Sequence, residues 1–375
     1  MRIEALHLTG FRNYRAFYSE FSPSVNLICG DNAQGKTNLL ESICYLSQTH
    51  SFRTRKELEL VRFGADYADM EAKIFSDGRE QILRAVLFSG KRPRQLFLNG
   101  VKQKNAQSLK GVLTTVLFCP EDLLVLKKGA AERRRMIDAA LCQLRPRYDR
   151  AVEEYTRLYN QKSAILRDHF ERPDLMEVLP EFNERMAAAG ALIVSGRAKY
   201  LRELERYASQ FHSRFSGGTE ELRIEYRTVS TIDDPYAPTK RLYEQIREHQ
   251  QLHARAEAES GQCLSGPHKD DFEVFLGDRS IKAYGSQGQT RTAAISMKLA
   301  EREIFHADTG EMPVLLLDDV LSELDAGRQD FVLNQIKTGQ VFITCCDKTR
   351  LTELGQTLMI EDGVLLGGGQ AEGGV

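Results

Sequence analysis

One segment constrains the fold of this chain more than any other: residues 30–37, which read GDNAQGKT. The segment fits the pattern GxxxxGK[ST], in which glycines let backbone N–H groups turn toward phosphates and the N-terminus of the next helix adds its dipole. The strand-like run SVNLIC precedes it, and the helix-forming run NLLESICYL follows it. This order predicts an α/β layer with a nucleotide-binding loop. The alternative is a glycine-rich turn that carries an exposed lysine.

The residues of this phosphate loop (residues 30–37) have distinct expected roles. Lys36 is expected to contact the β- and γ-phosphates of ATP, and Thr37 to ligate Mg²⁺. The other candidate nucleotide-binding residues contribute mainly the backbone of the loop: Gly30, Asp31, Asn32, Ala33, Gln34 and Gly35.

A second motif is an apolar strand that ends in two acids, PVLLLDD at residues 313–319. Unpaired charge at the end of a buried strand is costly, so these carboxylates are expected to face a metal ion. Asp318 is the candidate Mg²⁺ ligand, and Asp319 the candidate general base for an attacking water. Two solvated acids that open a turn are the alternative.

A third motif is the signature loop (residues 284–291), YGSQGQTR, which precedes an amphipathic helical run. Alone, it would be interpreted as a helix-capping turn. Between the other two motifs it resembles the signature of ABC-type ATPases, in which the serine and the helix N-terminus bind the γ-phosphate held by the other subunit. The candidates are Ser286, Gly288 and Gln289. Residues 322–325, SELD, resemble the D-loop of those enzymes, and an N-cap serine with a turn aspartate is compatible with the same letters.

The rest of the chain alternates in character. Short β-like runs fill residues 1–115, with a helix beginning at Lys36. Residues 116–263 show the apolar spacing of helices, notably in the run 133–166. Strands and helices alternate again in residues 264–365, and residues 366–375 are expected to be a disordered tail. We therefore expect an α/β fold: an ABC-type ATPase head, a mixed sheet with a P-loop core made from both ends of the chain, with an inserted, mainly helical lobe.

Five segments together resemble the RecF family: residues 8–14, residues 51–53, PEDLLVLKKGAAERRRMID at 120–138, GPHKDD at 266–271 and LLLDDVLSELD at 315–325. The resemblance spans nearly the whole chain. It implies DNA repair and replication, an ATP-dependent homodimer, duplex or gapped DNA as the ligand, and mediators of the RecO and RecR kind as partners. SMC relatives carry far longer insertions. The roles of His268, Lys269 and Asp270 stay open, and Lys162 and Ser163 depart from the family pattern and receive no role.

Two departures from transporter ATPases imply slow hydrolysis. Asp319 stands where those proteins place glutamate, and Thr344, Cys345 and Cys346 stand where a switch histidine would follow the next strand. The same departures argue against a transporter subunit. A metabolic P-loop kinase would lack the signature loop, and the chain after Asp325 is too short for a nuclease domain.

A formal net charge of -2 gives the whole molecule no attraction for DNA, so DNA contacts require local basic clusters. Three clusters are candidates, each also compatible with a solvated face: Arg53, Arg55 and Lys56; Lys91, Arg92 and Arg94; and Arg133, Arg134 and Arg135. The last cluster has a further alternative, pairing with acids of a neighbouring helix. Arg12 and Asn13 are expected to approach the nucleotide.

The seven cysteines include no CxxC pair and are expected to be reduced and buried. The N-terminus opens into a strand pattern without a charged and then apolar leader, and no long uncharged stretch occurs. A cytoplasmic protein that does not enter a membrane is the expectation.

Overall fold

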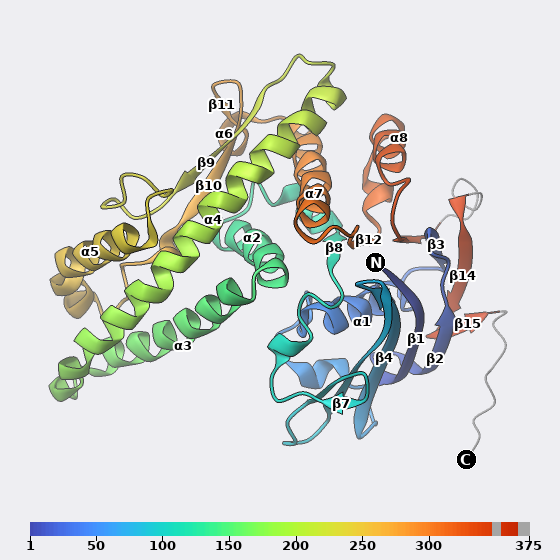
Figure 1. The fold of residues 1–375 in the computed structure, drawn as a ribbon, viewed down its shortest axis with the longest axis horizontal. Helices are drawn as coiled ribbons and strands as arrows, with labels where there is room; N and C mark the ends of the chain where they lie inside the picture. Colours follow the sequence, from blue (N-terminus) through green and yellow to red (C-terminus); the bar gives the residue numbers. More distant parts are fainter. Residues whose placement is uncertain (347–353, 367–375) are drawn as a thin grey trace. The chain divides into compact units, whose positions relative to one another are not determined.

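A computed structural model describes residues 1–346 and 354–366 (Figure 1). The described chain divides into two compact units: unit 1 contains the described residues of 1–123 and 298–375, and unit 2 contains residues 124–297. The boundaries predicted from the sequence, after residues 115, 263 and 365, stay a prediction. Of the predicted tail, residues 367–375 lie outside the described residues.

Unit 1 contains an antiparallel sheet with the order β2-β1-β4-β5-β6-β7. Its strands are β1 (Arg2–Phe11), β2 (Tyr14–Glu20), β4 (Tyr67–Ser76), β5 (Arg79–Phe88), β6 (Gln95–Leu98) and β7 (Val101–Lys102). Burial in β4 alternates residue by residue, which is the pattern of a strand with one face on a core. The sheet therefore has one packed face.

A second sheet of unit 1 has the order β15-β14-β3-β13-β12-β8 and is parallel except for the β14–β15 hairpin. Its strands are β3 (Val25–Cys29), β8 (Thr115–Phe118), β12 (Val314–Leu317), β13 (Val341–Cys345), β14 (Gln356–Glu361) and β15 (Val364–Leu366). Strand β12, next to the edge strand β8, is buried along its whole length. Strands from both ends of the chain thus form one buried sheet, as expected for a parallel arrangement.

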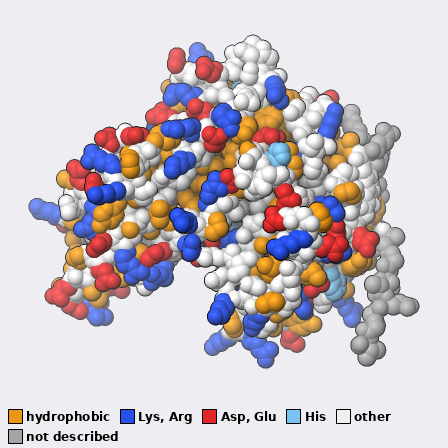
Figure 2. Space-filling model, in the orientation of Figure 1, with side chains coloured by type: hydrophobic (Ala, Val, Ile, Leu, Met, Phe, Trp, Pro, Cys, Tyr) orange, Lys and Arg blue, Asp and Glu red, His pale blue; other side chains and the backbone are white. Residues whose placement is uncertain are grey.

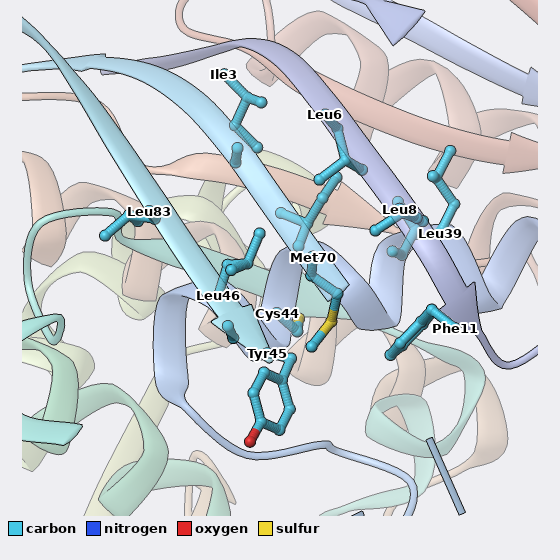
Figure 3. Packing of buried hydrophobic residues seen from close by; sticks show 14 of the residues in the cluster. Ile3, Leu6, Leu8, Phe11, Leu39, Cys44, Tyr45, Leu46, Met70 and Leu83 are labelled. Carbon is cyan, nitrogen blue, oxygen red and sulfur yellow. The ribbon is translucent and has the colours of Figure 1, made fainter. Parts of the chain in front are cut away.

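Helix α1 (Lys36–Gln48) provides the core of unit 1. Its Leu39, Tyr45 and Leu46 pack with Leu6 and Met70 of the antiparallel sheet (Figure 3). The same buried cluster extends to Ile28, Leu316 and Phe342 of the parallel sheet. The helix that begins at the phosphate loop is therefore held between two sheets. Unit 1 also contains η1 (Glu57–Leu60), η2 (Ala106–Ser108), η6 (Val320–Glu323) and α8 (Ala326–Gln335).

Unit 2 combines long helices with a small antiparallel sheet of order β11-β10-β9. The strands are β9 (Leu222–Arg227), β10 (Asp271–Leu276) and β11 (Arg279–Ser280), and the helices are α2 (Ala130–Leu144), α3 (Pro146–Asp168), α4 (Leu179–Ser216), α5 (Thr239–Ser260) and α6 (Ile281–Tyr284). Short 3-10 turns are η4 (Pro173–Val178) and η5 (Pro267–Lys269), and η3 (Pro120–Leu124) and α7 (Gln287–Thr309) cross the unit boundaries along the chain.

One helical run predicted from the sequence, 133–166, is two helices. Pro146 has no N–H to continue α2 and occupies the first turn of α3, where none is needed. Within the described residues, no helix is both long and apolar enough to span a bilayer.

Candidate functional site

Two glycines of the phosphate loop occupy positions that no side chain could share. Gly30 has φ +158°, and a Cβ there would lie 2.2 Å from the carbonyl oxygen of Ile360. Gly35 has φ +115°, and a Cβ there would lie 2.7 Å from the side-chain amide of Asn13. Both distances are far below van der Waals contact, so the loop requires glycine at its two ends. The predicted strand, loop and helix lie in that order in β3, residues 30–35 and α1.

Lys36 lies almost fully buried at the start of α1. Its Nζ donates to the carbonyl oxygens of Gly30 at 2.7 Å and Asp31 at 3.0 Å, and lies 3.2 Å from Sγ of Cys346. The Lys36 side chain thus lies over the phosphate loop, and its ammonium is held there by neutral carbonyl acceptors. A phosphate group would be a stronger, charged acceptor for the same donors.

The two candidate Mg²⁺ ligands, Thr37 and Asp318, are hydrogen-bonded to each other. Thr37 Oγ1 donates to Asp318 Oδ1 at 2.9 Å, and Thr344 Oγ1 donates to the same oxygen at 3.0 Å. Burial raises the pKa of Asp318, and the two hydroxyl bonds oppose that rise. A hydroxyl oxygen and a carboxylate that converge beside a phosphate loop fit Mg²⁺, which prefers oxygen ligands and phosphate company. The sequence named Thr344 only as one of the residues in place of a switch histidine. Its contact with Asp318 was not predicted, because that contact depends on the pairing of β12 with β13.

Asp319 leaves the strand in a left-handed conformation, with φ 50°. Its backbone N–H donates to Thr344 Oγ1 at 2.7 Å, and its carbonyl accepts from Ser322 Oγ at 2.6 Å. The backbone of this residue is therefore fixed from both sides, while its side chain is half-buried. Asp325, two residues after the end of η6, caps α8 by accepting from the N–H of Arg328 at 3.0 Å. Asp325 rather than Ser322 is the capping residue.

The chain from residue 12 to residue 14 braces the phosphate loop from outside. Asn13 Nδ2 donates to the carbonyl of Gln34 at 2.9 Å, and the buried Tyr14 hydroxyl donates to the carbonyl of Gly35 at 2.9 Å. Arg12, by contrast, makes a two-point ion pair with the buried Glu41, at 2.8 and 2.7 Å. Arg12 therefore holds α1 in this structure, and its expected approach to the nucleotide stays a prediction. Glu41 was missed because it belongs to no recognised motif. Tyr14 lies in the family-like segment 8–14, but the sequence assigned it no role of its own.

The signature loop begins α7 in unit 2. Ser286 Oγ accepts from the N–H of Gln289 at 3.1 Å, and Gln289 Oε1 accepts from the N–H of Ser286 at 3.0 Å. This reciprocal pair is a capping box, so the loop does cap the helix, as the alternative interpretation of the sequence expected. Ser286 is nevertheless exposed. Gln289 Nε2 also donates to Glu220 at 2.7 Å, and the second oxygen of Glu220 lies 2.9 Å from Nε2 of the buried His212. The bond from Gln289, together with His212, lowers the pKa of Glu220.

The three basic clusters differ in availability. Arg133 is buried and pairs with both oxygens of Asp271 at 2.7 Å, which excludes it from phosphate contact in this structure. Its acid lies in β10 and not in a neighbouring helix. Arg94 is engaged with Glu57, Tyr45 and the carbonyl of Thr49. The remaining basic side chains of the clusters are exposed or partly exposed: Arg53, Arg55, Lys56, Lys91, Arg92, Arg134 and Arg135. Figure 2 shows Lys and Arg mixed with acidic side chains over the visible face.

The GPHKDD segment is part of a buried polar network in unit 2. Asp270 pairs with the buried Arg197 at 3.1 Å and accepts from the Tyr226 hydroxyl. Arg197 also pairs with Asp138 at 2.8 Å. Burial raises the pKa of Asp270 to about 6 and lowers that of His268 to about 4. The network supports a structural role for His268 and Asp270.

Lys162 has a structural role that the sequence did not indicate. The side chain is fully buried, and its ammonium lies 2.6 Å from Glu257 and 2.7 Å from the side-chain oxygen of Asn183. The pair joins α3 to α5 across 95 residues of sequence. No local pattern indicates such a contact.

Comparisons with known proteins agree over nearly the whole chain. The family model described as the RecF/RecN/SMC N terminal domain matches residues 2–362. A relative from Acetivibrio thermocellus, named DNA replication and repair protein RecF, is 36% identical over 351 residues, which cover 93% of this chain and 94% of the relative. The protein of the same name from Bacillus subtilis is 36% identical, with 92% of this chain and 93% of the relative covered.

Solved structures give the same result. A structure described as the recombination mediator protein RecF-ATPrS in the RecFOR pathway superposes with a TM-score of 0.91 at 32% identity and covers 97% of both chains. An SMC head domain from Pyrococcus furiosus matches with a TM-score of 0.54 at 17% identity, covering 97% of this chain and 94% of that chain, which confirms the ATPase-head fold alone. With a family model over residues 2–362 and relatives at 36% identity over nine-tenths of their length, this chain belongs to the RecF family of DNA replication and repair proteins.

Proposed function

We propose that this chain is an ATP-dependent DNA-binding protein of recombinational repair and replication restart, in which ATP binding joins two copies into a clamp on DNA. The observation that carries the proposal is the convergence of Thr37 and Asp318 at 2.9 Å, beside a lysine folded over a glycine-bounded loop. The arrangement fits ATP with Mg²⁺. Support also comes from two matched structures whose descriptions read RecF-ATPrS and RecF-ATP, with TM-scores of 0.91 and 0.88.

The phosphate loop supplies the nucleotide contacts. The backbone of residues 30–35 binds the phosphates, and Lys36 exchanges its carbonyl acceptors for β- and γ-phosphate oxygens. Thr37 and Asp318 would hold Mg²⁺, which neutralises phosphate charge when bound. Asp319 orients and deprotonates the attacking water. Its carboxylate is one methylene shorter than that of glutamate, so hydrolysis is slow and serves to reset the dimer.

The signature loop completes the nucleotide site of a second copy. Ser286 is exposed at the N-terminus of the 23-residue helix α7, where N–H groups and the helix dipole attract an anion. The capping box fixes Ser286, with Gly288 and Gln289, before any ligand arrives. Only a nucleotide with a γ-phosphate spans from one copy's Lys36 to Ser286 of the second copy, so ATP and not ADP drives dimerisation.

The clamp binds duplex DNA or a gapped junction through phosphates. The available contacts are the exposed side chains of the first two clusters, Arg53, Arg55, Lys56, Lys91 and Arg92. None belongs to a recognition helix, so binding is largely independent of sequence. In the cytoplasm the clamp works with mediators of the RecO and RecR kind, helps load the recombinase and acts as a weak DNA-dependent ATPase.

Fluorescence anisotropy on two unrelated duplexes and one gapped molecule, across a salt series with and without ATP, tests the proposal. Each phosphate contact adds about -0.9 to the slope of log K against log salt, so ATP should tighten binding and steepen that slope. The Lys36→Met variant should show no response to ATP, while Lys269→Met should respond as the parent does. A strong preference for one duplex sequence, or binding indifferent to ATP and salt, would contradict the clamp.

A further inference from the structure

Three cysteines lie together where the parallel strands β3 and β13 end. Cys345 lies opposite Cys29 in the parallel register, and their sulfur atoms are 2.9 Å apart. Cys29 directly precedes Gly30, the first residue of the phosphate loop. Cys29 is buried, Cys345 is half-buried, and Cys346 is exposed. The burial of all seven cysteines that the sequence predicted is therefore wrong for Cys346, and Cys119, Cys142 and Cys345 are only half-buried.

Cys346 touches the phosphate loop at two points. Its Sγ lies 3.2 Å from Nζ of Lys36 and 3.1 Å from Oδ1 of Asn32. Of the seven cysteines, all within the described residues, it alone is exposed. Packing explains Cys29 and Cys44, which are buried among apolar side chains. It does not explain an exposed thiol in contact with a lysine and an asparagine.

The neighbouring sulfur atoms do not form a metal site, since no group of three His, Cys, Asp or Glu side chains with the spacing of a metal site occurs among the described residues. The hydrogen bond with Cys29, together with burial, raises the pKa of the Cys345 thiol far above its ordinary value. Cys345 is thus held as a protonated, unreactive thiol, because the thiolate is the nucleophilic form. Cys346 is the member of the cluster that solvent-borne reagents can reach.

We propose that Cys346 is a thiol-modification site, at which a low-molecular-weight disulfide of the glutathione class forms a mixed disulfide that blocks nucleotide binding. The Cys346 sulfur attacks one sulfur of the disulfide, the bond between its two sulfurs breaks, and a new sulfur–sulfur bond forms to Cys346. The leaving thiolate takes the proton that Cys346 loses, so one thiol is consumed and one released. The inference rests on the proposed function, because it assigns the loss of nucleotide binding to the proposed ATP site.

The expected block follows from the contact distances. An adduct on Cys346 adds a chain of many atoms at a sulfur that is already in contact with Lys36 and Asn32. The glutathione moiety also carries carboxylates, which compete with phosphates for the Lys36 ammonium. ATP affinity should therefore fall by about tenfold or more. Reduction with a dithiol restores it, because the exchange is reversible.

The test treats the full chain with oxidised glutathione and measures binding of a fluorescent ATP analogue and the mass of each cysteine peptide. The reduced chain should bind ATP, the treated chain should lose binding, and the adduct should map to Cys346. Cys346→Ser should keep ATP binding after treatment, whereas Cys142→Ser, a half-buried cysteine of α2, should lose it as the parent does.

Several results would overturn the inference: an adduct on Cys346 with unchanged ATP binding, a Cys29–Cys345 disulfide in place of the adduct, or loss of binding in treated Cys346→Ser. If the Cys346→Ser variant does not fold, protection of the parent's cysteines by bound ATP provides the test instead. Bound ATP should slow labelling of Cys346 but not of Cys142, and equal slowing or none contradicts the inference. Failure of the reduced chain to bind ATP would overturn the proposed function as well.

Discussion

Asp318 and Asp319 are adjacent in sequence, but the left-handed backbone of Asp319 gives them different surroundings. Asp318 is buried and accepts hydrogen bonds from two hydroxyl groups, whereas the backbone of Asp319 bonds to Thr344 and Ser322. Two acids in one motif can thus divide the work of metal binding and proton transfer. The division follows from the end of β12, where the strand stops after the fourth residue of its apolar run.

Asp319→Asn should keep ATP binding and slow hydrolysis by about a hundredfold or more, because a general base contributes about that much. Phosphate release and binding of a fluorescent ATP analogue measure the two effects. Asp77→Asn is the matched control, since Asp77 also has a left-handed backbone, with φ 52°, and lies in a turn of the other sheet. Equal loss of ATP binding in Asp319→Asn would identify Asp319 as a metal ligand.

Arg133→Ala should lower the free energy of unfolding by about 3 kcal/mol, because the change leaves Asp271 without its two-point partner. The estimate is at the lower end for a buried pair, since the Asp271 side chain is 26% exposed. Arg135→Ala, two residues away and exposed, should change it by less than about 0.5 kcal/mol. Urea unfolding measures both. Similar stability in the two variants would show that the Arg133 pair contributes little.

Among the elements, the N-terminus of α7 is held in place by a chain of side-chain contacts as well as by its own capping box. Gln289 joins the signature loop to Glu220, and Glu220 joins it to His212 at the end of α4. Both partners lie in the same unit as Ser286. The link fixes the first turn of α7 to a long, well-packed helix.

Glu220→Ala should leave ATP binding by the monomer unchanged and lower ATP turnover by about tenfold, the effect of losing one hydrogen bond to a charged group. The adjacent Glu221→Ala is the control, because its side chain is exposed. Steady-state turnover against ATP concentration separates the two quantities. Equal ATP turnover in both variants would show that Glu220 does not support the function of the signature loop.

The network around η5 predicts a pH-dependent stability. The pKa of Asp270, about 6 in the folded protein, lies above its ordinary value, so the folded state binds this proton more tightly than the unfolded chain. The resulting stabilisation is fully present below about pH 4 and is lost as pH rises through about 6.

Between pH 7.5 and pH 5 the parent should therefore gain about 1 kcal/mol relative to Asp270→Asn, which cannot titrate. Urea unfolding of parent and variant at the two pH values checks the difference. Asp168→Asn, at an exposed position near the end of α3, should show no such divergence. A constant difference between parent and Asp270→Asn would contradict the assignment.

For the molecule as a whole, the ATPase-head fold was predictable because its motifs are local. The phosphate loop, the acid-tipped strand and the signature loop each occupy eight residues or fewer, and the structure gives the strand and helix context expected for each. Contacts that join distant segments were not predictable. Thr344 meets Asp318 only through strand pairing, and Lys162 meets Glu257 only through helix packing. Neither contact leaves a periodic or motif-like trace in the sequence.

The central claim, that ATP held by the phosphate loop joins two copies, is tested most directly by sedimentation velocity at micromolar concentration with Mg²⁺. Asp319→Asn is the species to measure, because slow hydrolysis preserves the bound ATP. The account predicts a dimer with ATP, a monomer with ADP, and a monomer with either nucleotide when Lys36→Met is added. A monomer with saturating ATP, or an equal dimer with ADP, would contradict it.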